Sequence, residues 1–427
     1  MKTIAILHHS APPEMGVVEK NIYNHILLLN QAGYSLRVIS GVQDEAYYES
    51  GFHHSVMLLP VREILPDFPE TAAITQSLAA GEMHPDFKAA VHSLIARLMP
   101  LLSGVQVCFV YNTLTTPQNL LLTAALHTLR QRLPVRLVAW TLDDSSQPDL
   151  PLPSGSGSSA PFPWSLLCQV WPGVRYVAAS RHCQERLTSQ LQIAPEEIAV
   201  IPAGIDPEEF LKWEPHTHQL VHDHGLFEAA PLLLCPCIIA PGRRLEFAIQ
   251  VVAALGRRYP RAAMLVFDLS HPDRPVDPDY ARALRTQARD SGIPQRIHLA
   301  YARDSVDALL QFSNAVLADL YHLADLLFLP YQQDCLGIPL LRAGLVRLPI
   351  FASDTSPFAA LPGGLPHAFD PNGSPEEVAQ AIADSLQADP AFAVRQQVLD
   401  QFTWQAILKN QLTPLVEEST GSPDTLS

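Results

Sequence analysis

Residues 320–357 read LYHLADLLFLPYQQDCLGIPLLRAGLVRLPIFASDTSP and hold the clearest structural signal in the chain. The apolar runs at 326–330 and 349–353 predict two buried strands, and residues 338–346 between them predict a helix. Gly337 and Pro339 mark the first turn of this helix. A strand, a helix and a second strand in this order favour a parallel sheet, with a ligand site at the carboxyl ends of its strands.

The same alternation of strands and helices extends over both halves of the chain. In the first half, strands are expected at 3–7, 35–40, 105–111, 135–141, 174–178 and 198–201. In the second half, further strands are expected at 232–239, 263–268 and 296–299, with helices at 245–258, 278–290, 316–324 and 375–386. We therefore predict an α/β protein of two Rossmann-like domains, whose parallel sheets face each other across a cleft.

A polar stretch rich in histidine interrupts this alternation and predicts a domain boundary. Its histidines suit a transition metal, but no cysteine or carboxylate spacing beyond Asp223 supports a dedicated site, so a solvated linker is the favoured interpretation. These histidines are His216, His218, His222 and His224. The predicted organisation is an N-terminal domain at 1–213, a linker at 214–230, a C-terminal domain at 231–395, a C-terminal helix at 396–414 and a disordered tail at 415–427.

The composition narrows the class of protein. The 427 residues carry a formal net charge of -15, which argues against a nucleic-acid partner because such a partner requires a cationic face. No apolar run approaches the roughly 18 residues that a membrane span needs. Peripheral membrane contact stays open, because Arg243–Arg244 and Arg257–Arg258 are local basic patches. Six scattered cysteines and a first apolar run too short for a secretory signal predict a cytoplasmic location.

Several motifs, in order along the chain, resemble one enzyme family. Residues 320–357 resemble the donor-site signature of retaining GT-B glycosyltransferases, the family four group that includes sucrose synthase and bacterial mannosyltransferases. Other segments that resemble the family are APPEMGVVE at 11–19, WTLD at 140–143, YVAAS at 176–180, VIPAGIDP at 200–207 and LLCPCIIAPGRRLEFA at 233–248. The resemblance covers nearly the whole chain and implies the GT-B architecture.

The resemblance also implies a reaction. Such an enzyme transfers a hexose from a UDP- or GDP-linked sugar to an acceptor, with retention at the anomeric carbon. The acceptor is expected to be a carbohydrate or a lipid-linked molecule. The nucleotide sugar is a co-substrate, and neither a cofactor nor a metal is expected, because cationic side chains and a helix end neutralise the phosphates.

Two loops of the second domain are expected to bind the donor. The resemblance places Arg243 at the diphosphate, with Arg244 beside it, and it places Asp334 at the transferred sugar as a catalytic residue. Read without the resemblance, the two arginines are also compatible with a cationic helix start. The expected donor-binding residues are Arg243, Arg244, Cys335, Leu336, Gly337, Ile338 and Arg342.

The first domain is expected to bind the acceptor. Gly16 lies in a glycine-bearing turn after the first strand, and His9 ends that strand on the side of the predicted cleft. Asp143 is assigned a catalytic role and Asp144 an acceptor contact, although both are also compatible with turn residues. His9 is likewise compatible with an ordinary loop position.

Four positions depart from the family pattern. They are Val17 in the glycine turn, Leu142 in place of a histidine, Ile238 in place of an arginine, and Arg342 in place of a glutamate. A guanidinium only donates hydrogen bonds, so Arg342 cannot accept one from a ribose hydroxyl. It is compatible with phosphate binding, with pairing to Asp334 or with a solvated helix face. The departures keep a second hypothesis open, that of a catalytically impaired GT-B protein acting as a binding or partner subunit.

Overall fold

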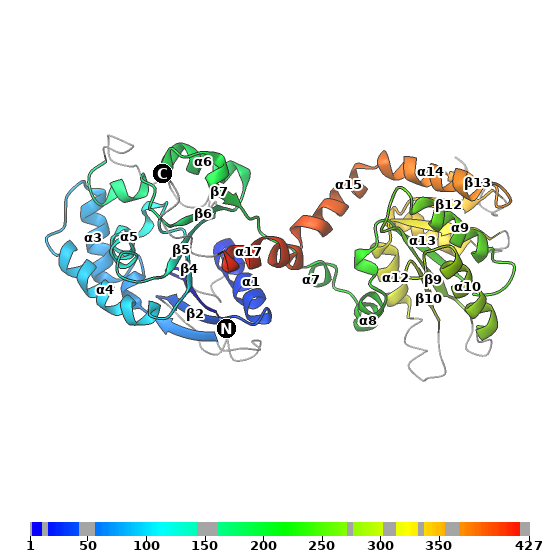
Figure 1. The fold of residues 1–427 in the computed structure, drawn as a ribbon, viewed down its shortest axis with the longest axis horizontal. Helices are drawn as coiled ribbons and strands as arrows, with labels where there is room; N and C mark the ends of the chain where they lie inside the picture. Colours follow the sequence, from blue (N-terminus) through cyan, green and yellow to red (C-terminus); the bar gives the residue numbers. More distant parts are fainter. Residues whose placement is uncertain are drawn as a thin grey trace. The chain divides into compact units, whose positions relative to one another are not determined.

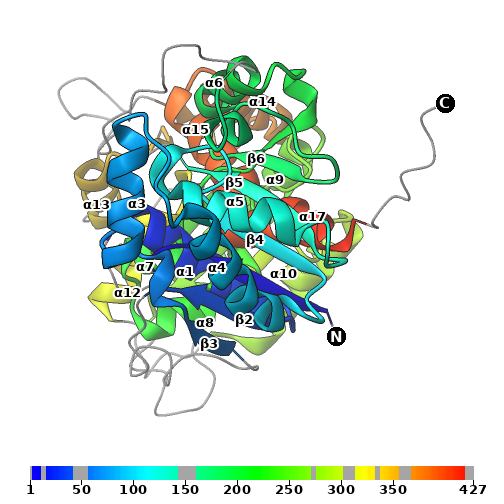
Figure 2. The ribbon, with the colours of Figure 1, turned by 90° about the vertical axis from the view of Figure 1, so that its left-hand side faces the viewer.

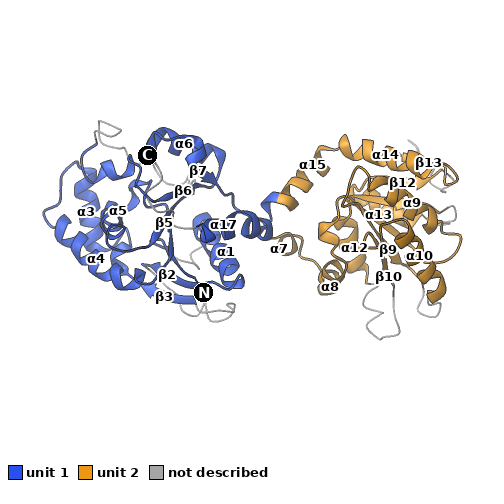
Figure 3. Ribbon diagram, viewed as in Figure 1, with its two compact units in different colours: residues 1–205, 401–427 blue, residues 206–400 orange. Residues whose placement is uncertain are grey.

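The chain folds into two α/β units, coloured separately in Figure 3. The computed structural model describes residues 2–10, 16–41, 56–142, 160–270, 276–301, 313–331, 337–354 and 367–418. Unit 1 consists of Met1–Ile205 together with Gln401–Ser427, and unit 2 consists of Asp206–Asp400.

Unit 1 is built on a parallel sheet of seven strands in the order β3-β2-β1-β4-β5-β6-β7 (Figure 1). Alternate side chains of its central strand enter different layers, because Ile4 and Ile6 join one core cluster and Ala5 and Leu7 join another. This alternation is the period of two expected for a strand buried on both faces. The strands are β1 (Thr3–Leu7), β2 (Ser35–Ser40), β3 (Val56–Pro60), β4 (Val107–Tyr111), β5 (Arg136–Thr141), β6 (Arg175–Ala178) and β7 (Ile198–Val200).

Helices cover both faces of this sheet. One core cluster joins the strands to α3 (Pro69–Ala79), α4 (Phe87–Leu102), α5 (Leu120–Leu129) and α6 (Arg181–Leu191). Figure 2 shows α4 and α5 in front of the sheet. The other cluster joins the opposite face to α1 (Val17–Gln31) and to the C-terminal segments α16 (Trp404–Ile407) and α17 (Thr413–Glu417).

Unit 2 is built on a second parallel sheet, of six strands in the order β10-β9-β8-β11-β12-β13. Its strands are β8 (Leu232–Cys237), β9 (Ala263–Asp268), β10 (Ile297–Ala300), β11 (Leu326–Leu329), β12 (Ile350–Ser353) and β13 (His367–Phe369). Its helices are α7 (Pro207–Leu211), α8 (Pro215–His224), α9 (Leu245–Leu255), α10 (Pro278–Asp290), α12 (Asn314–Leu323), α13 (Ile338–Val346), α14 (Pro375–Gln387) and α15 (Pro390–Gln397). A single apolar core runs from β8 to α14.

The predicted linker at 214–230 differs from the structure, because much of it is helix α8 of unit 2. Thr217 and Val221, one helical turn apart, are both buried. Asp319 of α12 accepts hydrogen bonds from Thr217 Oγ1 at 2.7 Å and from the Glu214 amide at 2.9 Å. These contacts attach the histidine-rich segment to unit 2, and the chain passes between the units after Ile205 instead.

The C-terminal segment returns to unit 1, and its buried part extends beyond residue 414, where the predicted helix ends. The Ile205 amide donates to Phe402 O at 2.8 Å, and the Trp404 amide donates to Ile205 O at 3.1 Å. Leu415 and Val416 are buried in the core of unit 1. The prediction that a disordered tail begins at residue 415 therefore places the start of the tail too early.

The predicted fold class, two Rossmann-like α/β domains with parallel sheets, is confirmed by the two sheets and their helices. The cleft between the domains stays a prediction. None of the helices in the described ranges is long and apolar enough to span a membrane.

Candidate functional site

Each unit has one point where the strand order reverses. In unit 2 the chain passes from β8 outward to β9 and β10, and then returns to place β11 on the other side of β8. In unit 1 the corresponding pair is β1 and β4. Loops that leave such a pair diverge, and ligands of open α/β sheets bind in the resulting crevice at the carboxyl ends of the strands.

At the reversal point of unit 2, Arg243 lies against the loop that follows β11. Its guanidinium carbon lies 5.2 Å from the centroid of the Tyr331 ring, within range of a cation–π interaction. Tyr331 Oη donates a hydrogen bond to Pro236 O in β8, and Ser353 Oγ donates to Tyr331 O, both at 3.1 Å. Arg243 is half-buried. Tyr331 is therefore held from both neighbouring strands, its ring hydroxyl by β8 and its backbone carbonyl by β12.

The loop that starts at Tyr331 leads to the N-terminus of α13. Gly337 precedes this helix with φ +58°, a left-handed conformation that side chains disfavour. Pro339 occupies the first turn, which has no acidic residue, and Tyr321 Oη donates to Pro339 O at 3.3 Å. Crossover helices run antiparallel to their strands, so α13 begins at the same sheet edge as Arg243. A cation and the positive end of a helix dipole thus share one edge of unit 2.

Arg244 and Arg342 point to other partners. Arg244 has φ +55°, donates a hydrogen bond to Pro371 O, and lies 5.7 Å from the centroid of the Phe247 ring. Arg342 Nη2 lies 3.4 Å from Asn314 Oδ1 on α12. These contacts tie neighbouring elements of unit 2 together, and they do not bring either guanidinium to the Tyr331 ring.

Several predicted site residues lie outside the described residues, namely Asp143, Asp144, Asp334, Cys335 and Leu336. Ile338, the first residue of α13, is 43% exposed, and Ile238, which follows β8, is 41% exposed. The position where the family has an arginine therefore carries an accessible apolar side chain.

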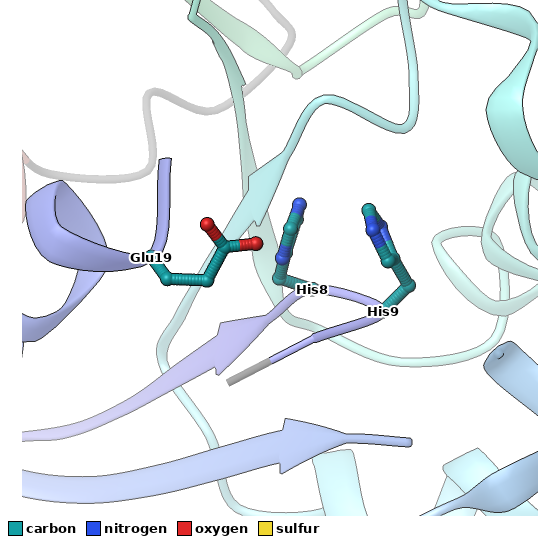
Figure 4. Close-up of side chains that lie close together, drawn as sticks. All are labelled: His8, His9 and Glu19. Carbon is teal, nitrogen blue, oxygen red and sulfur yellow. The ribbon is translucent and has the colours of Figure 1, made fainter. Parts of the chain in front are cut away.

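At the reversal point of unit 1, two histidines and a glutamate come together (Figure 4). His8 and His9 follow β1, with ring centroids 4.0 Å apart, and Glu19 lies in the first turn of α1. Ser10 links them, because its hydroxyl donates to Glu19 Oε1 at 2.5 Å and lies 3.1 Å from His8 Nδ1. His8 Nδ1 also lies 2.9 Å from Ser10 O. Of this group only His9 was predicted as an acceptor-binding residue, together with Gly16 before the start of α1.

Burial controls the protonation of both imidazoles. It lowers the pKa of His8 to about 3, helped by the neighbouring His9 and opposed by the hydrogen bond to the Ser10 backbone. Burial also lowers the pKa of His9, and the charge of Glu19 opposes that shift. Both rings are therefore neutral at pH 7, and their nitrogen lone pairs are available to accept hydrogen bonds or to bind a cation.

Gly16 permits the position of Glu19. A Cβ at residue 16 would lie 1.8 Å from Glu19 Oε2, so only glycine leaves room for a carboxylate folded against the start of α1. The next residue, Val17, is 86% exposed. The departure at Val17 thus leaves the close approach of Glu19 to Gly16 intact.

The loops after β4 and β5 complete this edge of unit 1. Asn112 has φ +44°, and its Oδ1 accepts a hydrogen bond from the Leu142 amide at 2.7 Å. Leu142 itself is buried. The residue that replaces the family histidine therefore packs into the core and presents no polar group.

Tyr331, Ser10 and Glu19 were not predicted as site residues. Tyr331 directly follows a predicted strand, and Glu19 stands three residues after Gly16, where an acid often caps a helix. Nothing in the sequence marks Ser10 as a site residue, because its role depends on two side chains that only folding brings close to it.

Comparisons with known proteins give information about the fold and about nothing else. Neither protein-family models nor curated protein sequences match this chain. Similar solved structures include a glycosyltransferase from Rickettsia africae ESF-5, at 13% identity over 98% of this chain and 99% of that chain, with a TM-score of 0.36. WaaG, a glycosyltransferase involved in lipopolysaccharide biosynthesis, shows 15% identity over 98% and 100%, with a TM-score of 0.32. HepE from Anabaena, in complex with UDP and glucose, shows 16% identity over 97% and 99%, with a TM-score of 0.35.

At these identities the likeness concerns the fold alone, and at these TM-scores it adds nothing to what the two sheets already establish. The solved structures that resemble this chain include glycosyltransferases, and the function of this chain rests on its own site residues.

Proposed function

We propose that this chain is a glycosyltransferase that moves a hexose from a UDP- or GDP-linked sugar to a carbohydrate or lipid-linked acceptor, with retention. Unit 2 binds the nucleotide sugar, and unit 1 binds the acceptor. The resemblance of the sequence motifs supports the reaction class, and the geometry of unit 2 supports the position of the donor.

The observation that carries the proposal is the place of Arg243. It lies over Tyr331 at the strand reversal of unit 2, where the loop toward Gly337 and α13 begins. A guanidinium and a helix N-terminus on one sheet edge suit a diphosphate, which accepts hydrogen bonds from both. When the bond between the sugar and the diphosphate breaks, negative charge grows on the leaving group, and these two features stabilise it.

The other assigned residues keep the roles that the resemblance implies. Asp334 would act at the transferred sugar, and Asp143 and Asp144 at the acceptor, together with His9 and Gly16. Cys335, Leu336 and Ile338 would line the donor loop. Arg244 and Arg342 are the exceptions, because their side chains contact Pro371 and Asn314, and they would act by holding neighbouring elements of unit 2 together.

Calorimetric titration of the full chain with UDP and GDP tests the donor site. Arg243→Ala should weaken nucleotide binding about 10- to 100-fold, which corresponds to the loss of a hydrogen bond to a charged group. Arg282→Ala is the matched control, because Arg282 is an exposed arginine of the same unit that pairs only locally, with Asp279 at 2.7 Å. Equal affinity for the wild type and the Arg243 variant would refute the donor assignment.

Sugar release separates the enzyme from the partner hypothesis. Wild-type protein that binds UDP or GDP should also hydrolyse the matching nucleotide sugar slowly in the absence of acceptor. Nucleotide binding without any release of sugar would instead support a catalytically impaired binding subunit.

A further inference from the structure

The cluster at the reversal point of unit 1 has the composition of a metal site. His8, His9 and Glu19 each offer one ligand atom, and these atoms all lie within 4.8 Å of one another. Within the described ranges, this is the one group of three such side chains found so close together. Ligands of a tetrahedral zinc ion are about 3.4 Å apart, given bonds of about 2.1 Å. The 4.8 Å limit on the separations in this cluster exceeds that spacing by about 1.4 Å, so metal binding requires the side chains to move closer together.

The contacts around Ser10 favour one tautomer of His8. The Ser10 hydroxyl has one hydrogen, and its 2.5 Å contact with Glu19 Oε1 commits that hydrogen to the carboxylate. His8 Nδ1 lies 2.9 Å from Ser10 O, 3.1 Å from Ser10 Oγ and 3.3 Å from the Ser10 amide nitrogen. The shortest of these contacts favours a proton on Nδ1, because a carbonyl oxygen only accepts hydrogen bonds. His8 Nε2 is then an unprotonated nitrogen with a free lone pair.

That lone pair is buried and has no hydrogen-bond partner. His8 is 2% exposed, and its Nε2 is one of the buried polar atoms without a partner. An imidazole whose Nδ1–H bonds a backbone carbonyl while Nε2 stays free has the arrangement of a metal-ligating histidine, with the carbonyl holding the ring in place. The carboxylate of Glu19 adds the negative charge that a divalent cation needs nearby.

We propose that His8, His9 and Glu19 bind one divalent transition-metal ion of the zinc class. Two imidazoles and one carboxylate suit zinc or cobalt better than magnesium or calcium, which prefer oxygen ligands. Three protein ligands leave a fourth position for water or for a hydroxyl of a bound molecule. Ser10 orients His8 and one oxygen of Glu19 from outside the coordination shell. This proposal departs from the sequence-based expectation that no metal is bound, for which the reason given was the neutralisation of the donor diphosphate in unit 2.

Titration of the chelator-treated full chain with Zn²⁺, and separately with Co²⁺, tests the proposal without any assay of activity. The wild type should bind one equivalent tightly, and Co²⁺ should give the visible absorption of a four- or five-coordinate ion. His9→Ala and Glu19→Gln should each weaken Zn²⁺ binding more than 10-fold. Ser10→Ala should weaken it about 10- to 100-fold, as expected for a residue that orients a ligand.

A second set of histidines provides the control. His218 and His222 lie one turn apart on α8 and are able to chelate metal by themselves. The double variant His218→Ala/His222→Ala should retain the tight site. Loss of all Zn²⁺ binding in that variant, or unchanged binding in His9→Ala and Glu19→Gln, would overturn the proposal. Thermal unfolding of each variant with chelator present shows whether a loss of binding reflects loss of the fold.

Discussion

The two strand-reversal points have the same topology and opposite electrostatics. In unit 1, the start of α1 already holds the carboxylate of Glu19, and two neutral imidazoles lie beside it. In unit 2, the first turn of α13 has no acidic residue, and Arg243 lies at the same edge. One edge is therefore suited to a cation or to hydroxyl groups, and the other to an anion. The fold supplies two equivalent places, and a few side chains decide what each one binds.

Glycine has a different task at each helix start. Gly16 has an extended conformation, and it is needed because Glu19 Oε2 occupies the space of a Cβ. Gly337 has φ +58°, and it is needed because of its backbone conformation. The first glycine admits a negative charge to the helix end. The second leads the chain into a helix end that remains positive.

The largest expected effect is that lowering the pH destabilises unit 1 more than unit 2. Burial lowers the pKa of both His8 and His25 in unit 1 to about 3, and it lowers the pKa of His298 in unit 2 to about 4. In the unfolded chain these groups take up protons near pH 6.5, so their contribution to stability is complete above that pH and is lost as the pH falls toward the folded pKa. Between pH 7 and 5 each of these three histidines should cost about 2 kcal/mol, which gives about 4 kcal/mol from the pair in unit 1 and about 2 kcal/mol from His298 in unit 2. Burial also lowers the pKa of His9 and His127 in unit 1 and of His224 and His367 in unit 2, so each unit loses further stability in the same direction.

Hydrogen exchange of the β1 and β8 amides at pH 7 and pH 5, corrected for intrinsic rates, measures this difference. In unit 2, burial raises the pKa of Asp325, and a carboxyl shifted in this direction gains stability as the pH falls, opposite in sign to the histidines. His8→Gln should remove about 2 kcal/mol of the pH dependence in unit 1. An equal loss of exchange protection in both units would contradict the predicted difference in their response to pH.

Adding a cation at Ile238 should sharpen the contrast. Ile238 is 41% exposed and follows β8, the strand that also leads to Arg243. Ile238→Arg should raise the affinity for UDP or GDP about 10-fold, by adding a charge-assisted hydrogen bond to the diphosphate. Leu269→Arg is the control, because Leu269 is 37% exposed and follows the adjacent strand β9. Equal gains in both variants would indicate a general charge effect and no defined phosphate position.

The two glycines should respond differently to the same small change. Gly337→Ala should lower the free energy of unfolding by about 1 kcal/mol, because alanine is strained at positive φ. Gly16→Ala should cost less, because the clash involves only the flexible end of Glu19, but it should displace the carboxylate and weaken Zn²⁺ binding. Urea unfolding and Zn²⁺ titration of both variants give the two values. A larger loss of stability for Gly16→Ala than for Gly337→Ala would contradict this assignment of roles.

Local patterns predicted the regular elements where glycine, proline and apolar runs coincide. Helices α10 and α13 and strands β1, β2 and β9 have the predicted bounds. Strand β3 and helices α3 and α4 were not predicted; β3 has no fully buried residue, and α3 has three. Helix α8 was predicted as a linker because its histidines are polar, whereas two buried residues, Thr217 and Val221, hold it against α12.

The sequence by itself determined the two parallel α/β units and the expectation that Arg243 and Gly337 belong to one site. The units follow from short-range periodicity and from residues whose backbone preferences are local, whereas the shared site was implied by the resemblance of the motifs. The tertiary structure alone decided that Tyr331 supports Arg243, that Arg244 and Arg342 contact other elements, and that Ser10 joins Glu19 to His8. These pairings depend on which strands lie side by side and on how deeply a side chain is buried, and no local pattern encodes either.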